Sequence, residues 1–230
     1  MTLSIQETHE QFLHWYDKQA NFASPEVTPE EIDLYLNNAQ YQFLKILTEQ
    51  GLEKSQEWLD YTKNITKSYS TTLVSSSNKP NGFYVDLPID YKLVLLEEAD
   101  VTYSFCGIEQ AKRIPVVPTT RDEYNKVVQN PFKAPWKEEL VRLTADGNRF
   151  EVIGFPGSTL ITYHMDYLKE PQRIQYGSQY AGFNPPPDQD CELDSKATLK
   201  IIEIAVQLAL KTMGDPRLNL EQLDKLVKTI

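Results

Sequence analysis

The chain has 230 residues and a mass of 26.5 kDa, so it is long enough to bury one hydrophobic core, or one core and a small satellite domain. It carries 33 acidic and 23 basic side chains, a formal net charge of −10, without the Lys/Arg clusters that tight DNA or RNA binding requires. Two cysteines, Cys106 and Cys191, are too few for a disulfide framework or a metal-ligand set, so we expect reduced thiols.

The N-terminal stretch lacks the basic start and the apolar run of a signal peptide. No apolar stretch reaches the ~18 residues of a membrane span. We therefore expect a protein that is soluble in the cytosol and does not enter a membrane.

The first 80 residues are predicted to form helices. A weak helical pattern covers the first twenty residues. Residues 28–31 (TPEE) then have the order of a capping box, with Thr28 as N-cap and Glu31 able to reach back to the cap amide. Apolar residues recur at helical spacing as far as Gly51, which is placed to end the helix in a left-handed cap. A second helix, from about Glu53 to Lys67, is expected to form an antiparallel hairpin with the first.

The middle of the chain changes to a β-strand pattern. Residues 68–82 (SYSTTLVSSSNKPNG) lack periodic apolar residues and are interpreted as a boundary loop. Beyond them we expect a small antiparallel sheet, interrupted by one helix from about Thr120 to Gln129. Residues 146–148 (DGN) predict a tight hairpin turn. The expected strands are Leu93–Phe105, Lys112–Val117, Leu140–Thr144, Phe150–Ile153 and Thr159–Tyr167.

The short helix runs into Asn130-Pro131-Phe132, a tripeptide that allows two interpretations. Endocytic adaptor domains bind the same tripeptide as a linear ligand, but that mode of binding requires a flexible exposed tail. Structured patterns flank the tripeptide on both sides here. We therefore expect that the proline ends the helix at Asn130 and that Phe132 turns into the core as an anchor. Pro135 then stiffens the exit of the segment.

Residues 173–190 (RIQYGSQYAGFNPPPDQD) match no regular element. Ordered loops of this length are uncommon unless they are functional or a partner holds them. We therefore predict an extended arm at residues 173–192 that contacts a partner. Its candidate interface residues are Tyr176, Tyr180, Phe183, Pro185, Pro186 and Pro187.

The C-terminal region returns to a helical pattern. After Asp194, a good N-cap, residues Ser195 to Met213 are apolar around most of the helix, so this helix must pack against more than one surface. Residues 214–216 (GDP) end it, and a last short helix is expected from about Leu220.

The expected fold class is therefore α+β, a helical bundle with an inserted small antiparallel β-rich unit. Residues 1–80 supply the N-terminal helices, and residues 193–230 complete the bundle with the C-terminal helix and a tail. Residues 81–172 form the β-rich insert with its one short helix, and residues 173–192 form the arm.

Catalysis and metal binding have little support in the sequence. His9 and His14 are five positions apart, whereas four positions place two ligands on one face of a helix. His164 lies in a strand-like run and is interpreted as a surface or interface residue. The acidic residues within 97–100 are interpreted as an exposed charged edge rather than a catalytic pair. No nucleotide-binding or nucleophile motif occurs, so we predict no catalytic, cofactor or metal residue.

The aromatic content of 13 Tyr, 9 Phe and 3 Trp fits a core or a large protein interface equally well. Five segments then occur in a familiar order: FYVDLPIDY, RIPVVPTTRDEYNKVVQNPFKAP, VRL, YHMDYLKEPQRI and ELDSKATLKIIEIAVQLAL. In this order, from about Gly82 to Met213, the chain resembles head–tail connector, neck or ring proteins of crAss-like and related Bacteroidetes-infecting tailed phages. The residues that carry the resemblance are Leu87, Pro88, Pro115, Pro118, Glu123, Tyr124, Asn130, Pro131, Phe132, Pro135, Arg142, Tyr167, Leu168 and Pro171.

The resemblance implies a non-enzymatic virion subunit in an oligomeric ring of twelve copies in the phage neck. Such a ring would join the portal protein to the tail, as portal adaptors do, and would contact neighbouring neck and tail ring proteins. DNA would pass through its lumen during genome ejection without specific binding, and an acidic wall suits that passage. The chain would be made in the cytoplasm of the host bacterium, and its arm would reach a neighbouring subunit or the next ring.

A different class of function also fits the residues. The chain could act as a monomeric or dimeric module that binds peptides or regulates a partner, and an enzyme comes third. The mass of the protein in solution, alone and mixed with the portal protein, separates the first two classes.

Overall fold

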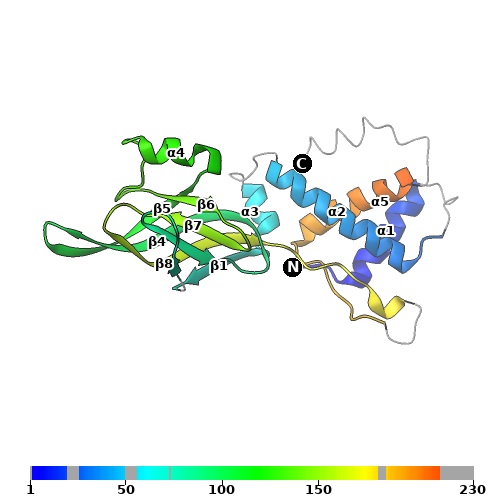
Figure 1. Cartoon of the computed structure of the whole chain (residues 1–230). Helices are drawn as coiled ribbons and strands as arrows, with labels where there is room; N and C mark the ends of the chain where they lie inside the picture. The colour runs from blue at the N-terminus through cyan, green and yellow to red at the C-terminus, as the bar shows by residue number, and fades with distance from the viewer. Residues whose placement is uncertain (1, 20–25, 50–55, 73, 181–184, 213–230) are drawn as a thin grey trace. The chain divides into compact units, whose positions relative to one another are not determined.

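The protein divides into two compact units in a computed structural model (Figure 1), which describes residues 2–19, 26–49, 56–72, 74–180 and 185–212. The helical unit comprises Met1–Ile65 and Pro171–Ile230, and the sheet unit comprises Thr66–Glu170. The helical unit therefore uses both ends of the chain, whereas the sheet unit is one continuous segment.

The helical unit contains α1 (Ile5–Gln19), α2 (Pro29–Glu49), α3 (Gln56–Thr62) and α5 (Ser195–Thr212). α5 contacts both α1 and α2. Phe12 of α1 and Phe43 of α2 are fully buried, and most of the circumference of α5 is buried, including Ile201 and Val206. The C-terminal helix therefore shares a core with α1 and α2.

The ends of the N-terminal helices agree only in part with the prediction. The backbone amide of Thr28 donates to the carboxylate of Glu31 at 2.9 Å, and the amide of Glu31 donates to the Thr28 hydroxyl at 3.3 Å, which confirms the capping box. The predicted second helix is wrong at its C-terminal end, because α3 stops at Thr62 and a strand begins at Thr66. The cap predicted at Gly51 and the helix predicted from Leu220 lie outside the described residues.

The sheet unit holds one eight-stranded sheet in the order β1-β8-β4-β5-β6-β7-β3-β2. The observed pairs are antiparallel except for β5 and β6, which are parallel and are joined by a crossover that contains α4 (Arg121–Gln129). The strands are β1 (Thr66–Thr71), β2 (Val74–Ser76), β3 (Gly82–Asp86), β4 (Tyr91–Phe105), β5 (Ile108–Pro118), β6 (Leu140–Thr144), β7 (Arg149–Ile153) and β8 (Ser158–Lys169).

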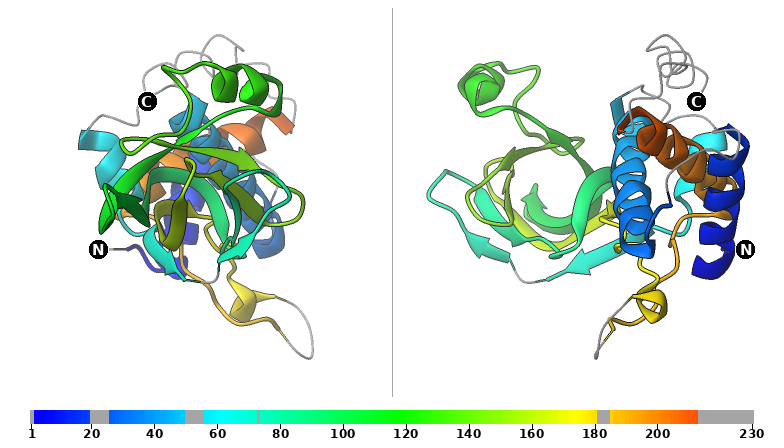
Figure 2. Two further views of the ribbon diagram at one scale, coloured as in Figure 1. Left: turned by 60° about the vertical axis from the view of Figure 1, so that its left-hand side comes forward. Right: turned by 90° about the vertical axis from the view of Figure 1, so that its right-hand side faces the viewer.

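The sheet curls because its two edge strands are consecutive in the chain. β1 and β2 end the strand order on opposite sides, yet only two residues separate Thr71 from Val74. β2 also approaches β8, and Figure 2 shows the strands curving around a common interior. Irregularities in the register of β4 against β8 assist the bend. The buried residues that fill the interior are Val85, Ala99, Val101, Tyr103, Ile114, Val116, Leu140, Phe150, Val152, Phe155, Leu160, Tyr163, Met165 and Tyr167.

The predicted fold class is wrong. The sequence predicts a helical bundle with a small antiparallel insert, whereas the structure has a curled mixed sheet that occupies about as much of the described chain as the helices. Part of the error lies in residues 68–82, interpreted as a loop, which include most of β1 and all of β2. β1 is mostly exposed and shows no apolar alternation, so its backbone pairing with β8, from Thr66 to Thr71, is what makes it a strand.

The other strand predictions are confirmed. β6 has its predicted bounds. The strands β4, β5, β7 and β8 include their predicted ranges and extend a few residues beyond them. The predicted hairpin turn joins β6 to β7, and Gly147 has a φ of 71°, a value that favours glycine.

Candidate assembly surfaces

The arm at residues 173–192 is a loop whose two sides pair near its base. Gln175 and Gln189 form an antiparallel bridge, with backbone N–H to O=C distances of 3.0 and 2.7 Å between nitrogen and oxygen. Across the loop, the carboxylate of Asp188 accepts the amide of Ser178 at 2.7 Å, at the short 3-10 helix η2 (Gly177–Gln179). The chain itself therefore orders the base of the arm.

One polar face of α2 holds the first side of the arm. Asp33, Asn37 and Gln40 are spaced i, i+4, i+7, which places them on one side of the helix. The side chain of Asn37 donates to the carbonyl of Ile174 at 2.8 Å and accepts the amide of the same residue at 3.0 Å. Gln40 donates to the carbonyl of Gln172 at 3.1 Å. The spacing of this polar stripe can be recognised in the sequence, and it was the available signal that this face of α2 contacts a polar segment of the chain.

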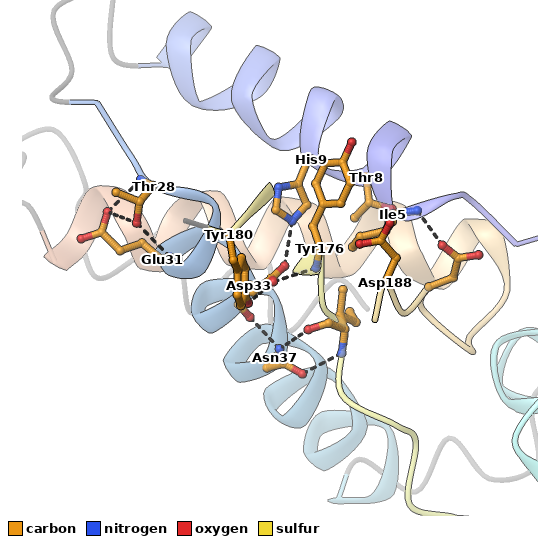
Figure 3. Close-up of polar contacts among 12 residues, drawn as sticks. Ile5, Thr8, His9, Thr28, Glu31, Asp33, Asn37, Tyr176, Tyr180 and Asp188 are labelled. Carbon is orange, nitrogen blue, oxygen red and sulfur yellow. Dashed lines mark hydrogen bonds and ion pairs between the residues drawn. The ribbon is translucent and has the colours of Figure 1, made fainter. Parts of the chain in front are cut away.

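Asp33 is the centre of a buried polar cluster (Figure 3). Its carboxylate lies 2.7 Å from Nε2 of His9, accepts the amide of Tyr176 at 2.8 Å and accepts the hydroxyl of Tyr180. Asp33 is 4% exposed and His9 is 5% exposed. Burial and the hydrogen bond to Asp33 raise the pKa of Tyr180 to about 12. Removing the Asp33 carboxylate would leave the buried His9 ring without this partner and the Tyr176 amide without its acceptor, so this cluster fixes the base of the arm.

Two of the six candidate interface residues therefore serve to attach the arm. Tyr176 and Tyr180 are half-buried and bind Asp33, and the Tyr176 ring meets the His9 ring edge-on at a centroid distance of 4.9 Å. Phe183 lies outside the described residues.

The other three candidates form the proline tip, Pro185 to Pro187. Pro185 and Pro187 are exposed, and Pro186 is half-buried. A Cβ atom on Gly177 would overlap the carbonyl of Pro186, so the close approach of the two segments requires glycine. Contact between the proline tip and a partner stays a prediction.

In the sheet unit, α4 is a helix without a buried side chain. It stands away from the curled sheet (Figures 1 and 2), and a nine-residue helix is marginal in water by itself. A few surface contacts hold it. Lys79 pairs with Glu151, and its Nζ lies 4.8 Å from the ring centroid of Tyr124, while Nη2 of Arg121 lies 3.0 Å from Oδ1 of Asp146.

The prediction that Phe132 anchors the core is wrong. α4 ends at Gln129, and Asn130 is extended, as the following proline predicts. The side chain of Asn130 then accepts the amide of Phe132 at 3.0 Å, which closes a tight turn and leaves the ring 96% exposed. Pro135, three residues later, is buried.

A second exposed aromatic group lies where the α4 crossover meets the β4–β5 hairpin. Phe105 is 50% exposed and Trp136 is 58% exposed. Nζ of Lys137 lies 3.5 Å from the ring centroid of Phe105 and 5.4 Å from that of Trp136. The buried ring of Phe155 lies 5.8 Å from the ring of Trp136 and 5.3 Å from that of Tyr103, centroid to centroid. We call Phe105, Trp136 and Lys137 the aromatic platform.

The interior of the sheet unit contains an ion pair that the sequence analysis missed. Nη2 of Arg142 lies 2.8 Å from Oε1 of Glu97, and the Tyr163 hydroxyl donates to the same carboxylate at 2.8 Å. The guanidinium carbon of Arg142 also lies 3.9 Å from the ring centroid of Phe150. Burial raises the pKa of Glu97, whereas Arg142 and Tyr163 act to lower it. The interpretation of Glu97 as part of an exposed edge is wrong. In the predicted strand, Glu97 alternates with Ala99 and Val101 on one face, and that apolar alternation was the available signal that the face is buried.

On the outer face of the sheet, His164 joins several strands. Its Nε2 lies 2.7 Å from Oδ2 of Asp100, and its Nδ1 lies 2.8 Å from the Ser70 hydroxyl. Hydrogen bonds from Arg113, which has the larger effect, and from His164 lower the pKa of Asp100 to about 2. Within the described ranges, no three His, Cys, Asp or Glu side chains group as metal ligands, and none of the helices there is long and apolar enough to cross a membrane.

The exposed rings of Phe132 and of the aromatic platform indicate a protein that assembles with partners, because uncovered aromatic side chains of this kind are typical of such proteins. A family model described as Phage tail ring protein 3/4 matches residues 4–216, and the chain belongs to that family.

Two curated relatives come from Bacteroides phage crAss001. Ring protein 3 is 25% identical over 202 residues, which cover 81% of this chain and 87% of the relative. Ring protein 4/5 is 24% identical over 240 residues, which cover 95% of this chain and 98% of the relative. These matches confirm the resemblance to ring proteins of crAss-like phages.

Proposed function

We propose that the chain is a structural virion protein that forms an oligomeric ring in the phage neck, joins the portal to the tail and leaves a channel for DNA. The observation that carries this proposal is the exposure of the α4 segment, which we define as α4 and the following turn, residues 121–132. The helix has no buried side chain, and Phe132 is 96% exposed. A ring subunit must present surfaces that remain uncovered until its neighbours bind. Membership of the ring protein family supports the same conclusion.

The specific form of the proposal has twelve copies in the ring, with the portal protein and other neck or tail ring proteins as partners. The two crAss001 relatives are named as ring proteins, which supports assembly into rings. The chain would be synthesised in the cytoplasm of the host bacterium and incorporated at the neck of the virion. The proposal requires no catalytic residue, cofactor or membrane contact.

The charge of the chain suits a wall around DNA. The formal net charge is −10, and most of it falls in the helical unit, Met1–Ile65 with Pro171–Ile230. Negative charge on a channel wall repels the phosphate backbone, so DNA passes without the counterion release that drives tight binding. We therefore propose passage of DNA through the ring without sequence-specific contact.

The test measures the mass of the full-length chain by size-exclusion chromatography with light scattering, alone and mixed with the portal protein. We expect a ring-sized mass in at least one of these samples. Phe132→Ala should raise the concentration for half-assembly by about tenfold or more, because burying a phenylalanine ring contributes about 1.5–3 kcal/mol.

Ile89→Ala is the matched control, since Ile89 is fully exposed in the sheet unit outside the α4 segment. It should leave assembly unchanged. A chain that stays monomeric in every mixture contradicts the proposal and favours the peptide-binding module instead.

A further inference from the structure

The proline tip has the properties of a preformed ligand. Proline fixes φ, so a run of three prolines loses little conformational entropy when it binds. Pro185 and Pro187 are exposed, and the packing of Pro186 against Gly177 holds the tip against η2. The cluster around Asp33 fixes the base of the same arm. A rigid apolar tip on a fixed base is therefore presented to a partner.

The aromatic platform has the properties of a receptor for such a tip. Proline-rich segments dock on surfaces lined by aromatic rings, because the flat ring faces match the ridges of the polyproline helix. Trp136 exposes more than half of its surface while it rests on the buried ring of Phe155. The Lys137 ammonium group lies 3.5 Å from the ring centroid of Phe105 and 5.4 Å from that of Trp136. Both rings are exposed, and Trp136 is held from below by Phe155, so a docking segment meets a supported Trp136 ring beside the Lys137 ammonium group.

The charges beside the two surfaces are complementary. Nζ of Lys112 donates to the carbonyl of Lys137 at 3.1 Å, so two cations lie at the platform. Among the described residues, neither cation pairs with a carboxylate. Asp188 and Asp190 follow the proline tip directly, and their carboxylates accept backbone amides but pair with no basic side chain in the same described ranges. Glu138 and Glu139 are also exposed near Lys137, so the match is local rather than a uniformly basic patch.

We propose that the proline tip of one copy docks on the aromatic platform of a neighbouring copy, with Asp188 and Asp190 facing Lys112 and Lys137. This inference rests on the proposed ring and names the surface that its arm recognises. The contact is heterologous, because the tip and the platform are different surfaces of the same chain. Repetition of a heterologous contact generates a closed ring when the rotation between neighbours closes.

The native cysteines provide a direct test of this contact. Cys106 is exposed and follows Phe105 of the platform, whereas Cys191 is buried. Pro187→Cys in the full-length chain places a second exposed thiol at the tip. A short bismaleimide should then join the Pro187→Cys tip of one copy to Cys106 of the next, and denaturing gels should show a ladder of multimers. Adding Cys106→Ser should abolish the ladder.

Ile89→Cys in place of Pro187→Cys is the matched control for random collision, because Ile89 is fully exposed. Trp136→Ala gives an independent test that needs no new thiol. It should raise the concentration for half-assembly by about tenfold or more relative to Ile89→Ala, because the Trp ring is a typical interface hot spot. Addition of salt should weaken assembly of the native chain, because the facing charges are exposed.

The outcomes separate this inference from the proposed function. Oligomers that form by light scattering but cross-link no better than the Ile89→Cys control overturn the docking contact and leave the ring intact as a proposal. A cross-link within a single chain, which leaves the band at monomer mass, also overturns the contact. A chain that stays monomeric alone and with its partners overturns both.

Discussion

Replacement of Arg142 by methionine tests the buried ion pair of the sheet unit. The side chain of Glu97 is 3% exposed and that of Arg142 is 11% exposed. At their 2.8 Å separation and an effective dielectric constant of about 20, the attraction is about 6 kcal/mol. Desolvation of the two groups offsets much of it, but removal of one partner leaves a buried charge. We therefore expect Arg142→Met to lower the free energy of unfolding by about 3–5 kcal/mol at pH 8.

The loss should depend on pH in a defined direction. Burial already raises the pKa of Glu97, and removal of Arg142 removes the largest effect that lowers it. A carboxyl group whose folded pKa lies above its unfolded pKa destabilises the protein increasingly as pH rises between those two values. The cost of Arg142→Met should therefore be largest at pH 8 and smaller at pH 5, where Glu97 takes up a proton more readily.

Urea unfolding at pH 5 and pH 8, followed by far-ultraviolet circular dichroism, measures both effects. The double variant Glu97→Leu/Arg142→Met is the control, because a buried pair replaced by apolar side chains of similar size recovers most of the loss. A single variant as stable as the native chain, or a cost that is equal at the two pH values, would refute this account of the pair.

Phe132→Ala should change the free energy of unfolding of the monomer by less than about 0.5 kcal/mol, because the ring of Phe132 is already exposed. Thermal unfolding at low protein concentration measures this change, and a loss of several kcal/mol would instead support a buried ring. Gly177→Ala should open the arm, because the added Cβ meets the carbonyl of Pro186, and hydrogen exchange should accelerate in the arm while α5 stays protected. Asp33→Asn should accelerate exchange of the Tyr176 amide, which donates to that carboxylate, and unchanged exchange would contradict the described attachment. Asp100→Asn should remove a stability loss that the native chain shows as pH falls from 3.8 to about 2, because the folded pKa of Asp100 is lowered into that range.

Local signals in the sequence predict local structure well here. The capping box at Thr28 and Glu31 starts α2, and the proline after Asn130 ends α4. The turn at Gly147 joins two strands that alternation had already indicated. In each case the deciding interactions lie within a few residues of one another.

The errors concern contacts between distant residues. β1 is defined by its pairing with β8, about a hundred residues further along, and its own side chains carry no strand pattern. Curling of the sheet depends on the same long-range pairing. The local pattern of any one segment therefore does not predict this sheet, which is why the predicted fold class is wrong.

The candidate site divides in the same way. The arm was located from its lack of regular pattern, but its attachment to Asp33 and Asn37 required knowing which helix lies beside it. The sequence around an apolar side chain such as Phe132 is the same whether the side chain packs in the core of its own chain or is left for a partner to cover. Only the structure distinguishes a core position from an exposed one.

A cryo-electron microscopy reconstruction of the neck in virions of the phage that encodes this chain tests the proposed ring most directly. We expect copies of the chain in a closed ring between portal and tail, around the path of the DNA, with the proline tip of each copy on the aromatic platform of the next. Absence of the chain from the neck, or its presence there as isolated copies without a ring, would contradict the proposed function.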